Sequence, residues 1–277
     1  RGDAESEALM PFVMSSDDVR IHWTEWGDPD GEPVLFIHGL GADNLGWARQ
    51  RRAFADYRCI AVDNRGSGRS DKPEGPYDLT RLALDAVEVL DDAGVERAHV
   101  IGASMGGALT QIVGALHSER AATLTLACTA CQLHTWRAEL FDSWIELIET
   151  KGMRAFAINN LQWLVGPRSL RRLYPVAAAL GPLLLRAPVH GFLGQVEALR
   201  NVDPSIADQL ADVSAPALVL TGSQDILTPV ADAEEIASRL PDCELVVIRG
   251  AAHGFMVESA GVFNEVVLDF LARHPLR

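Results

Sequence analysis

A single serine stands among small residues in the stretch VIGASMGGAL, residues 100–109. Gly102, Ser104 and Gly106 together fit the pattern G-x-S-x-G. One role for such a serine is to cap the helix that follows the turn, since serine is common at that position. The other role is that of a nucleophile on a strained strand-to-helix turn, where only small neighbours fit. Because the pattern also occurs by chance, other parts of the sequence must distinguish the two roles.

A nucleophilic serine needs a base and an acid, and the second half of the chain offers both. Serine attacks a carbonyl only if a base takes its proton, and imidazole suits this task because it titrates near neutral pH. Of the eight histidines, His253 alone both follows the last apolar run and lies in a glycine-flanked loop, GAAHGF. Asp225, in GSQDILTP, follows the preceding run and would hold the other ring nitrogen. Ser104, His253 and Asp225 are therefore residues of the types that a nucleophile, a base and an acid require.

These three residues each follow a short apolar run, and the runs alternate with helical segments. The predicted strands cover residues 19–27, 33–39, 57–63, 98–104, 122–130, 215–222 and 243–250. The predicted helices cover residues 79–93, 105–117 and 258–272. This alternation predicts an α/β protein with a mostly parallel central sheet and helices on both faces. In such a sheet ligands bind at the carboxyl ends of the strands, so the three residues should meet at one edge.

One long segment interrupts the alternation. Residues 132–205 contain no convincing strand, but they show helical periodicity over 137–151, 152–164, 168–180 and 189–201. We therefore predict a helical cap at 132–205, inserted into a core formed by 12–131 and 206–277, with residues 1–11 as a disordered lead-in. The segment is rich in tryptophan, leucine and alanine. The residues predicted to wall an apolar pocket over Ser104 are Leu133, Trp136, Trp144, Trp163 and Phe192.

Composition excludes several classes of partner. The chain has 277 residues with 38 acidic against 24 basic side chains, a net charge of −14 that disfavours nucleic acid. The sequence has no apolar run of the length that a transmembrane helix needs, so no membrane span is predicted. No set of histidines and carboxylates has metal-site spacing, and no glycine pattern fits a nucleotide loop, so neither metal nor cofactor is expected. The oligomeric state is left open.

The four cysteines are predicted to be small buried side chains. They are Cys59, Cys128, Cys131 and Cys243. The pair C-x-x-C at 128–131 lacks both a second ligand pair and the strand-turn-helix placement of a redox motif. Free cysteine is often buried, and a reduced cytoplasmic location is the default expectation.

Five motifs in order make the chain resemble the α/β-hydrolase fold family from about residue 12 to 273. The motifs are HGLG, DNRGSGRS, GASMGG, GSQDILTP and GAAHGF. The resemblance implies a triad with Ser104 as nucleophile, His253 as base and Asp225 as acid. It assigns the competing carboxylate Asp63 to bracing the turn before Arg65 and Ser67. It also implies an oxyanion hole made by the backbone N–H groups of Leu40 and Met105. A helix N-terminus such as that at Met105 presents unpaired amides to negative charge.

Within that family the sequence is most similar to 3-oxoadipate enol-lactonases and related carboxylesterases. A serine on the strand-to-helix turn favours acyl transfer. The dehalogenases and epoxide hydrolases of the family need a carboxylate at that position. An enol-lactone that carries carboxylates would require a cap arginine, for which Arg137, Arg154 and Arg168 are candidates. The Leu/Ala-rich cap is better suited to an apolar group. We therefore expect a hydrolase of small-molecule esters or lactones.

Three alternatives remain open beside this expectation. Carbon–carbon bond hydrolases and polyketide methylesterases share much of the same sequence pattern, and both would use the same triad. A scaffold that binds a hydrophobic ligand or a partner protein without catalysis is the alternative from a different class. An intact Ser–Asp–His set argues against that scaffold, because a pure binding protein has no need for all three residues.

Overall fold

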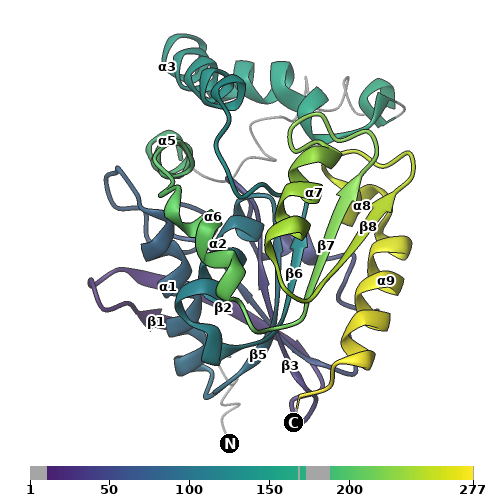
Figure 1. Ribbon diagram of the computed structural model, residues 1–277. Coiled ribbons are helices and arrows are strands. Elements are labelled where there is room, and N and C mark those ends of the chain that lie inside the picture. Colours follow the sequence, from purple (N-terminus) through teal and green to yellow (C-terminus); the bar gives the residue numbers. More distant parts are fainter. Residues whose placement is uncertain (1–10, 168, 173–187, 277) are drawn as a thin grey trace, which may run out of the picture.

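The computed structural model describes residues 11–167, 169–172 and 188–276. An eight-stranded sheet runs through it in the order β1-β2-β4-β3-β5-β6-β7-β8 (Figure 1). The strands are β1 Phe12–Met14, β2 Arg20–Gly27, β3 Pro33–Ile37, β4 Arg58–Val62, β5 Ala98–Ala103, β6 Ala121–Ala127, β7 Ala217–Gly222 and β8 Cys243–Ile248. β2 pairs antiparallel with β1 and β4, and every other pair is parallel. The predicted α/β class with a mostly parallel sheet is confirmed.

The two edges of the sheet differ from the sequence-based expectation. β1 is a three-residue edge strand that was not predicted, because so short a run carries little periodicity. Cys243 was predicted to be buried, but its strand, β8, forms the opposite edge and pairs only with β7. Leu245 and Val247 are therefore exposed, and Cys243 is half-buried. An apolar run predicts a strand here but does not say whether the strand has one neighbour or two.

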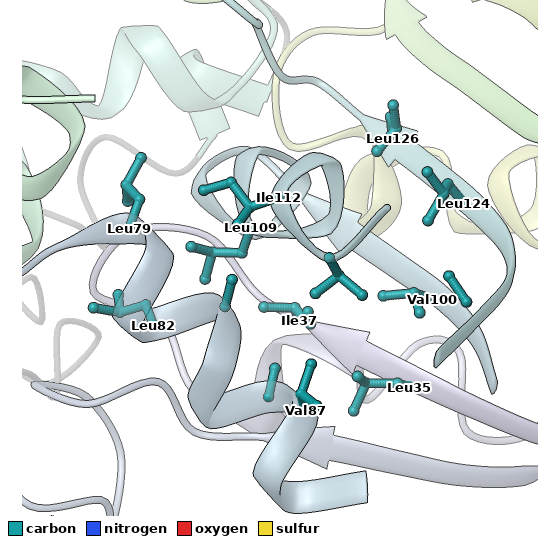
Figure 2. Close-up of a cluster of buried hydrophobic side chains, with 14 of the residues drawn as sticks. Leu35, Ile37, Leu79, Leu82, Val87, Val100, Leu109, Ile112, Leu124 and Leu126 are labelled. Atoms are coloured by element: carbon teal, nitrogen blue, oxygen red, sulfur yellow. The ribbon is translucent and has the colours of Figure 1, made fainter. Parts of the chain in front are cut away.

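Helices cover both faces of the sheet. One face carries α1 Leu79–Asp92, α2 Met105–Leu116, α6 Ser205–Gln209 and α7 Val230–Arg239, and the other carries α8 Phe255–Glu258 and α9 Ala260–Arg273. Short 3-10 turns lie at Asn44–Trp47, Ser118–Arg120 and Leu210–Asp212. Figure 2 shows part of the buried cluster to which α1, α2 and the sheet contribute, with Leu109 and Ile112 from α2 and with Ile37 and Val100 from the strands. This packing fixes the start of α2, which directly follows Ser104.

The described part of 132–205 contains helices and no strand. α3 Thr135–Leu164 and α5 Val189–Arg200 lie above the carboxyl ends of the strands in Figure 1. Gly152, at φ 78° and ψ 170°, divides α3 at the boundary predicted between 151 and 152. Most of the predicted helix 168–180, the Leu/Ala-rich stretch up to 187 and nearly all of the lead-in lie outside the described residues. None of the described helices is both long and apolar enough to cross a membrane.

Candidate active site

Ser104 lies on a sharp turn between β5 and α2, with a positive φ of 57° and ψ of −119°. A side chain on either flanking glycine would clash, since a Cβ at Gly102 would lie 2.1 Å from the Gly106 carbonyl oxygen and one at Gly106 would lie 2.0 Å from that of Ile37. The Ser104 N–H donates to the Ala127 carbonyl at 2.9 Å, which holds the turn. The Ser104 side chain makes no capping hydrogen bond and lines a cavity instead. The small neighbours thus serve a strained turn that presents the hydroxyl.

His253 and Asp225 form a buried hydrogen-bonded pair on neighbouring loops. The distance between His253 Nδ1 and Asp225 Oδ2 is 2.8 Å. Asp225 Oδ1 accepts from the N–H groups of Leu227 and Thr228, both at 2.9 Å, and the Thr228 hydroxyl donates to Oδ2 at 2.8 Å. Burial alone would raise the pKa of the Asp225 carboxyl, but His253 and these donors together lower it. An ionised Asp225 accepts from Nδ1–H and leaves Nε2 of His253 available as a base.

A cavity of about 450 Å³ joins Ser104 and His253 to the cap helices. Its lining is mostly apolar side chains from α3 and α5 together with the loops at the carboxyl edge of the sheet. The structure places four of the five predicted wall residues along it: Leu133, Trp144, Trp163 and Phe192. Asp225 is not part of the lining and lies behind His253.

Trp136, the fifth predicted wall residue, does not line this cavity, and its assignment was wrong. Its side chain is 40% exposed on the first turn of α3, and the guanidinium of Arg137 stacks 4.7 Å from the ring centroid. Composition identified a tryptophan-rich segment, but it could not say which face of a helix each tryptophan occupies. Adjacent helical residues point about 100° apart, so the buried Arg137 leaves its neighbour facing outward.

The backbone groups predicted to bind an oxyanion lie beside Ser104. Leu40 and Met105 both line the cavity. A Cβ on Gly39 would lie only 3.0 Å from the Ser104 Cβ, so glycine allows this close approach. Among the described residues, none accepts a hydrogen bond from the Leu40 N–H. Met105 is the first residue of α2, where N–H groups have no acceptor within the helix.

Asp63 is fixed in the loop that follows β4, away from the cavity. Its carboxylate accepts from His22 Nδ1 at 2.9 Å, from the Arg69 N–H at 2.9 Å, and from the N–H and Nδ2 of Asn44 at 2.7 and 2.8 Å. Burial would raise its pKa, but these donors lower it. Every oxygen of this carboxylate is thus engaged in bracing backbone turns, while Asp225 reaches His253. This geometry fits the assignment that the sequence suggested for the two carboxylates.

The candidate cap arginines do not present a positive charge to the cavity in the part of the chain that the structure describes. Arg137 lines the cavity, but its buried guanidinium pairs with Asp232 and donates to the carbonyls of Leu227 and Gln132 at 3.1 and 2.9 Å. Arg154 is exposed and is not part of the lining, and Arg168 is outside the described residues. Of the two candidates that the structure describes, neither Arg137 nor Arg154 would provide a counter-ion for a dicarboxylate substrate.

The four cysteines are free thiols. Cys59, Cys128 and Cys131 are buried as predicted, and Cys128 and Cys131 both line the cavity. Burial raises the pKa of the Cys128 thiol well above its usual value and that of Cys131 to about 12. Both therefore remain protonated near neutral pH and are poor nucleophiles.

One group of described residues has metal-ligand geometry. His134, Asp232 and Glu235 place their ligand atoms within 4.8 Å of one another. The two carboxylates are already engaged, since Asp232 pairs with Arg137 and Glu235 with Arg239 at 3.0 Å. The cluster joins the start of α3 to α7 and does not contact the cavity, apart from the Arg137 that pairs with it. These residues fit an ion-pair junction better than a metal centre.

Comparison with known proteins agrees with the geometry. Residues 32–260 match the alpha/beta hydrolase fold family, and the chain belongs to this family. It is 28% identical to 3-oxoadipate enol-lactonase 2 of Acinetobacter baylyi, over 94% of this chain and 96% of that protein. It is 30% identical to a Variovorax paradoxus protein that carries the name carbamate hydrolase RutD, over 91% and 96%. The solved structure of Est816, an N-acyl homoserine lactone degrading enzyme, superposes with a TM-score of 0.79 at 30% identity, over 94% and 100%.

Proposed function

We propose that this hydrolase cleaves a carboxylic ester or lactone through an acyl-enzyme on Ser104. The Ser104 oxygen attacks the carbonyl carbon, while Nε2 of His253 takes the hydroxyl proton and passes it to the departing alkoxide. Water then attacks the acyl-enzyme with His253 again as base, which releases the acid and restores Ser104. Asp225 holds the imidazole by its Nδ1–H and stabilises the cation. The observation that carries this proposal is the buried His253–Asp225 hydrogen bond at the cavity that Ser104 lines.

The same proposal includes an oxyanion hole. The N–H groups of Leu40 and Met105 would donate to the negative oxygen of the tetrahedral intermediate. Preorganised donors of this kind usually supply a large share of the rate acceleration, because they need no reorganisation as charge develops. The described residues leave the Leu40 N–H without a protein acceptor, which supports this assignment.

We propose further that the substrate carries a medium-sized apolar or cyclic acyl group and no carboxylate. The cap at 132–205 would form the roof of its pocket, with Leu133, Trp144, Trp163 and Phe192 as walls. Arg137 is paired with Asp232, and Glu258 lies on the cavity lining, so the charged side chains that the structure describes there disfavour an anionic substrate. The enol-lactonase and homoserine-lactone relatives agree on lactone chemistry, and the apolar lining favours an acyl chain. Free thiols fit the proposed reduced, cytoplasmic location.

The proposal is tested with a fluorophosphonate probe and a substrate panel. The probe should label the wild-type protein but not Ser104→Ala, because only an activated serine is phosphonylated. The panel compares acetate, hexanoate and octanoate esters, an acylated homoserine lactone, a dicarboxylate lactone and an aryl carbamate. Highest kcat/KM on an apolar acyl ester or lactone supports the proposal. Fastest turnover of the dicarboxylate lactone contradicts the substrate class, and absence of both labelling and turnover favours a binding scaffold.

A further inference from the structure

Helix α5 is seated directly on the loops of the core rather than on other cap helices alone. Its two glycines make the close contacts. A Cβ on Gly191 would lie 2.5 Å from the Gly66 carbonyl oxygen, and one on Gly194 would lie 2.9 Å from the Tyr77 ring. Only residues without a side chain allow this approach, so α5 and the loop after β4 are held together at van der Waals distance.

Gln195, on the same face of α5, makes three hydrogen bonds that no sequence pattern suggested. Its Oε1 accepts from the Gly41 N–H at 2.8 Å, and its Nε2 donates to the Arg65 carbonyl at 2.8 Å and the Ser67 hydroxyl at 2.9 Å. The side chain has no exposed surface. A fully buried and fully hydrogen-bonded amide fixes its partners, because breaking any one bond leaves a buried polar group unsatisfied.

The Gly41 N–H is adjacent to the group proposed to bind the oxyanion. Leu40 precedes Gly41 in the short loop after β3, and Gly41 has a positive φ of 69°. On the other side of Leu40, the His38 carbonyl accepts from Asn64 Nδ2 at 3.0 Å. The loop is thus tied at both ends, once to the loop after β4 and once to the cap. Gln195 supplies the tie from the cap.

We propose that Gln195 is a positioning residue that holds the 38–41 loop so that the Leu40 N–H faces the developing oxyanion. This inference rests on the proposed function, since it assigns no new reaction. Phe192, which lines the cavity, lies on the same helix three residues earlier. One rigid helix therefore carries both a wall that contacts the acyl group and the support of the oxyanion loop. Gln195 therefore affects the stability of the transition state for every ester, while Phe192 affects which sizes of acyl group the cavity accepts.

The test compares Gln195→Met with Gln111→Met. Gln111 is a similarly buried glutamine whose Nε2 donates to the Gly107 and Ala130 carbonyls at 3.3 and 3.1 Å, and neither of these hydrogen bonds involves the 38–41 loop. Gln195→Met should lower kcat by about 10- to 100-fold with KM changed less than about threefold, since a small displacement of a catalytic donor costs rate rather than ground-state binding. The loss should be equal on acetate and octanoate esters.

A trifluoromethyl ketone supplies the second measurement, because its serine adduct places a negative oxygen in the oxyanion hole. Its affinity should fall by the same factor as kcat in Gln195→Met and stay within about threefold in Gln111→Met. Gln195→Glu keeps an acceptor for the Gly41 N–H, and its buried carboxyl, when protonated, can donate one hydrogen bond in place of Nε2. It should therefore recover part of the loss, which also covers the case in which Gln195→Met does not fold. Equal kcat and ketone affinity in Gln195→Met and Gln111→Met would overturn the inference. Full turnover by Ser104→Ala would instead overturn the proposed function itself.

Discussion

The carboxyl edge of the sheet and the wall formed by α3 and α5 contribute to one cavity by different physical means. At the edge, polar atoms are held by directional bonds, as with Asp225, which receives three donors besides His253. In the wall, apolar rings pack edge to face, with the Phe156 centroid 5.4 Å from Trp144 and 4.9 Å from Phe192. Hydrogen bonds weaken when their groups are displaced only slightly. A packed ring can be replaced by a smaller side chain with effects confined to its neighbours. The edge should therefore govern rate and the wall should govern substrate choice.

Replacing the nucleophile should produce the largest effect. Ser104→Ala should lower kcat by about 10⁴-fold or more, because the hydroxyl is the covalent centre of the proposed reaction. Steady-state kinetics on a good ester, with circular dichroism to verify the fold, measures this. Wild-type turnover by a folded Ser104→Ala protein would show that the carboxyl edge of the sheet does not supply the nucleophile.

Replacing the acid should produce a loss of about 10³- to 10⁴-fold in kcat. Asp225→Asn removes the charge that stabilises the imidazolium and favours the wrong tautomer of His253. The matched control is Asp63→Asn, a second buried carboxylate whose partners are His22 and backbone turns. Asp63→Asn should lower stability in urea unfolding far more than it lowers kcat of the folded fraction. If Asp225→Asn kept full activity and a folded Asp63→Asn protein were inactive, Asp63 would be the catalytic acid and Asp225 the structural carboxylate.

Trimming the wall should change the order of substrates more than the rate on a small ester. Trp163→Ala should alter the octanoate-to-acetate ratio of kcat/KM by about tenfold, since each buried methylene contributes about 0.8 kcal/mol. Trp136→Ala is the control, because this tryptophan lies outside the cavity and should leave the ratio within about twofold of wild type. Equal loss on both esters in Trp163→Ala would make this residue part of the general core rather than of the specificity wall.

The last expected effect is on stability rather than on rate, and it concerns pH and the loop beside Ser104. Burial, with a lesser contribution from His253, lowers the pKa of His38 to about 4. Between that value and the usual histidine pKa of about 6.5, the unfolded chain binds a proton that the folded protein does not. The free energy of unfolding should therefore fall as pH decreases through this window, by about 2 kcal/mol at about pH 5. Urea unfolding at about pH 8 and about pH 5 measures it.

The control for this pH effect is His38→Asn, whose side-chain oxygen can replace Nδ1 as acceptor for the Gly39 N–H. The stability of His38→Asn should depend less on pH over the same window, by the amount attributed to His38. An identical pH dependence in both proteins would show that other groups cause the acid sensitivity. That result would not affect the proposed roles of the residues at the carboxyl edge of the sheet. It would remove only the contribution assigned to His38.

The sequence by itself determined the class of fold and the three residues proposed for the chemistry. Short apolar runs separated by helical segments leave few arrangements other than a parallel sheet, and such a sheet brings strand ends to one edge. The glycines around Ser104 were readable because backbone strain restricts residue type locally. The hydrogen bond from the Thr228 N–H to Asp225, three residues earlier, could also have been predicted from the sequence. An aspartate that accepts from backbone N–H groups a few residues later is a common feature of local turns.

Only the tertiary structure decided which cap residues face the cavity and what holds the oxyanion loop. Periodicity gives the helices of the cap but not their rotation about their own axes, so Trp136 was placed on the wrong face and Arg137 was not seen to pair with Asp232. Gln195 meets Gly41 across 154 positions of sequence, and no local pattern encodes such a contact. Hydrogen bonds between distant segments depend on packing that is specified by the whole core, which is why they appear only once the chain is folded.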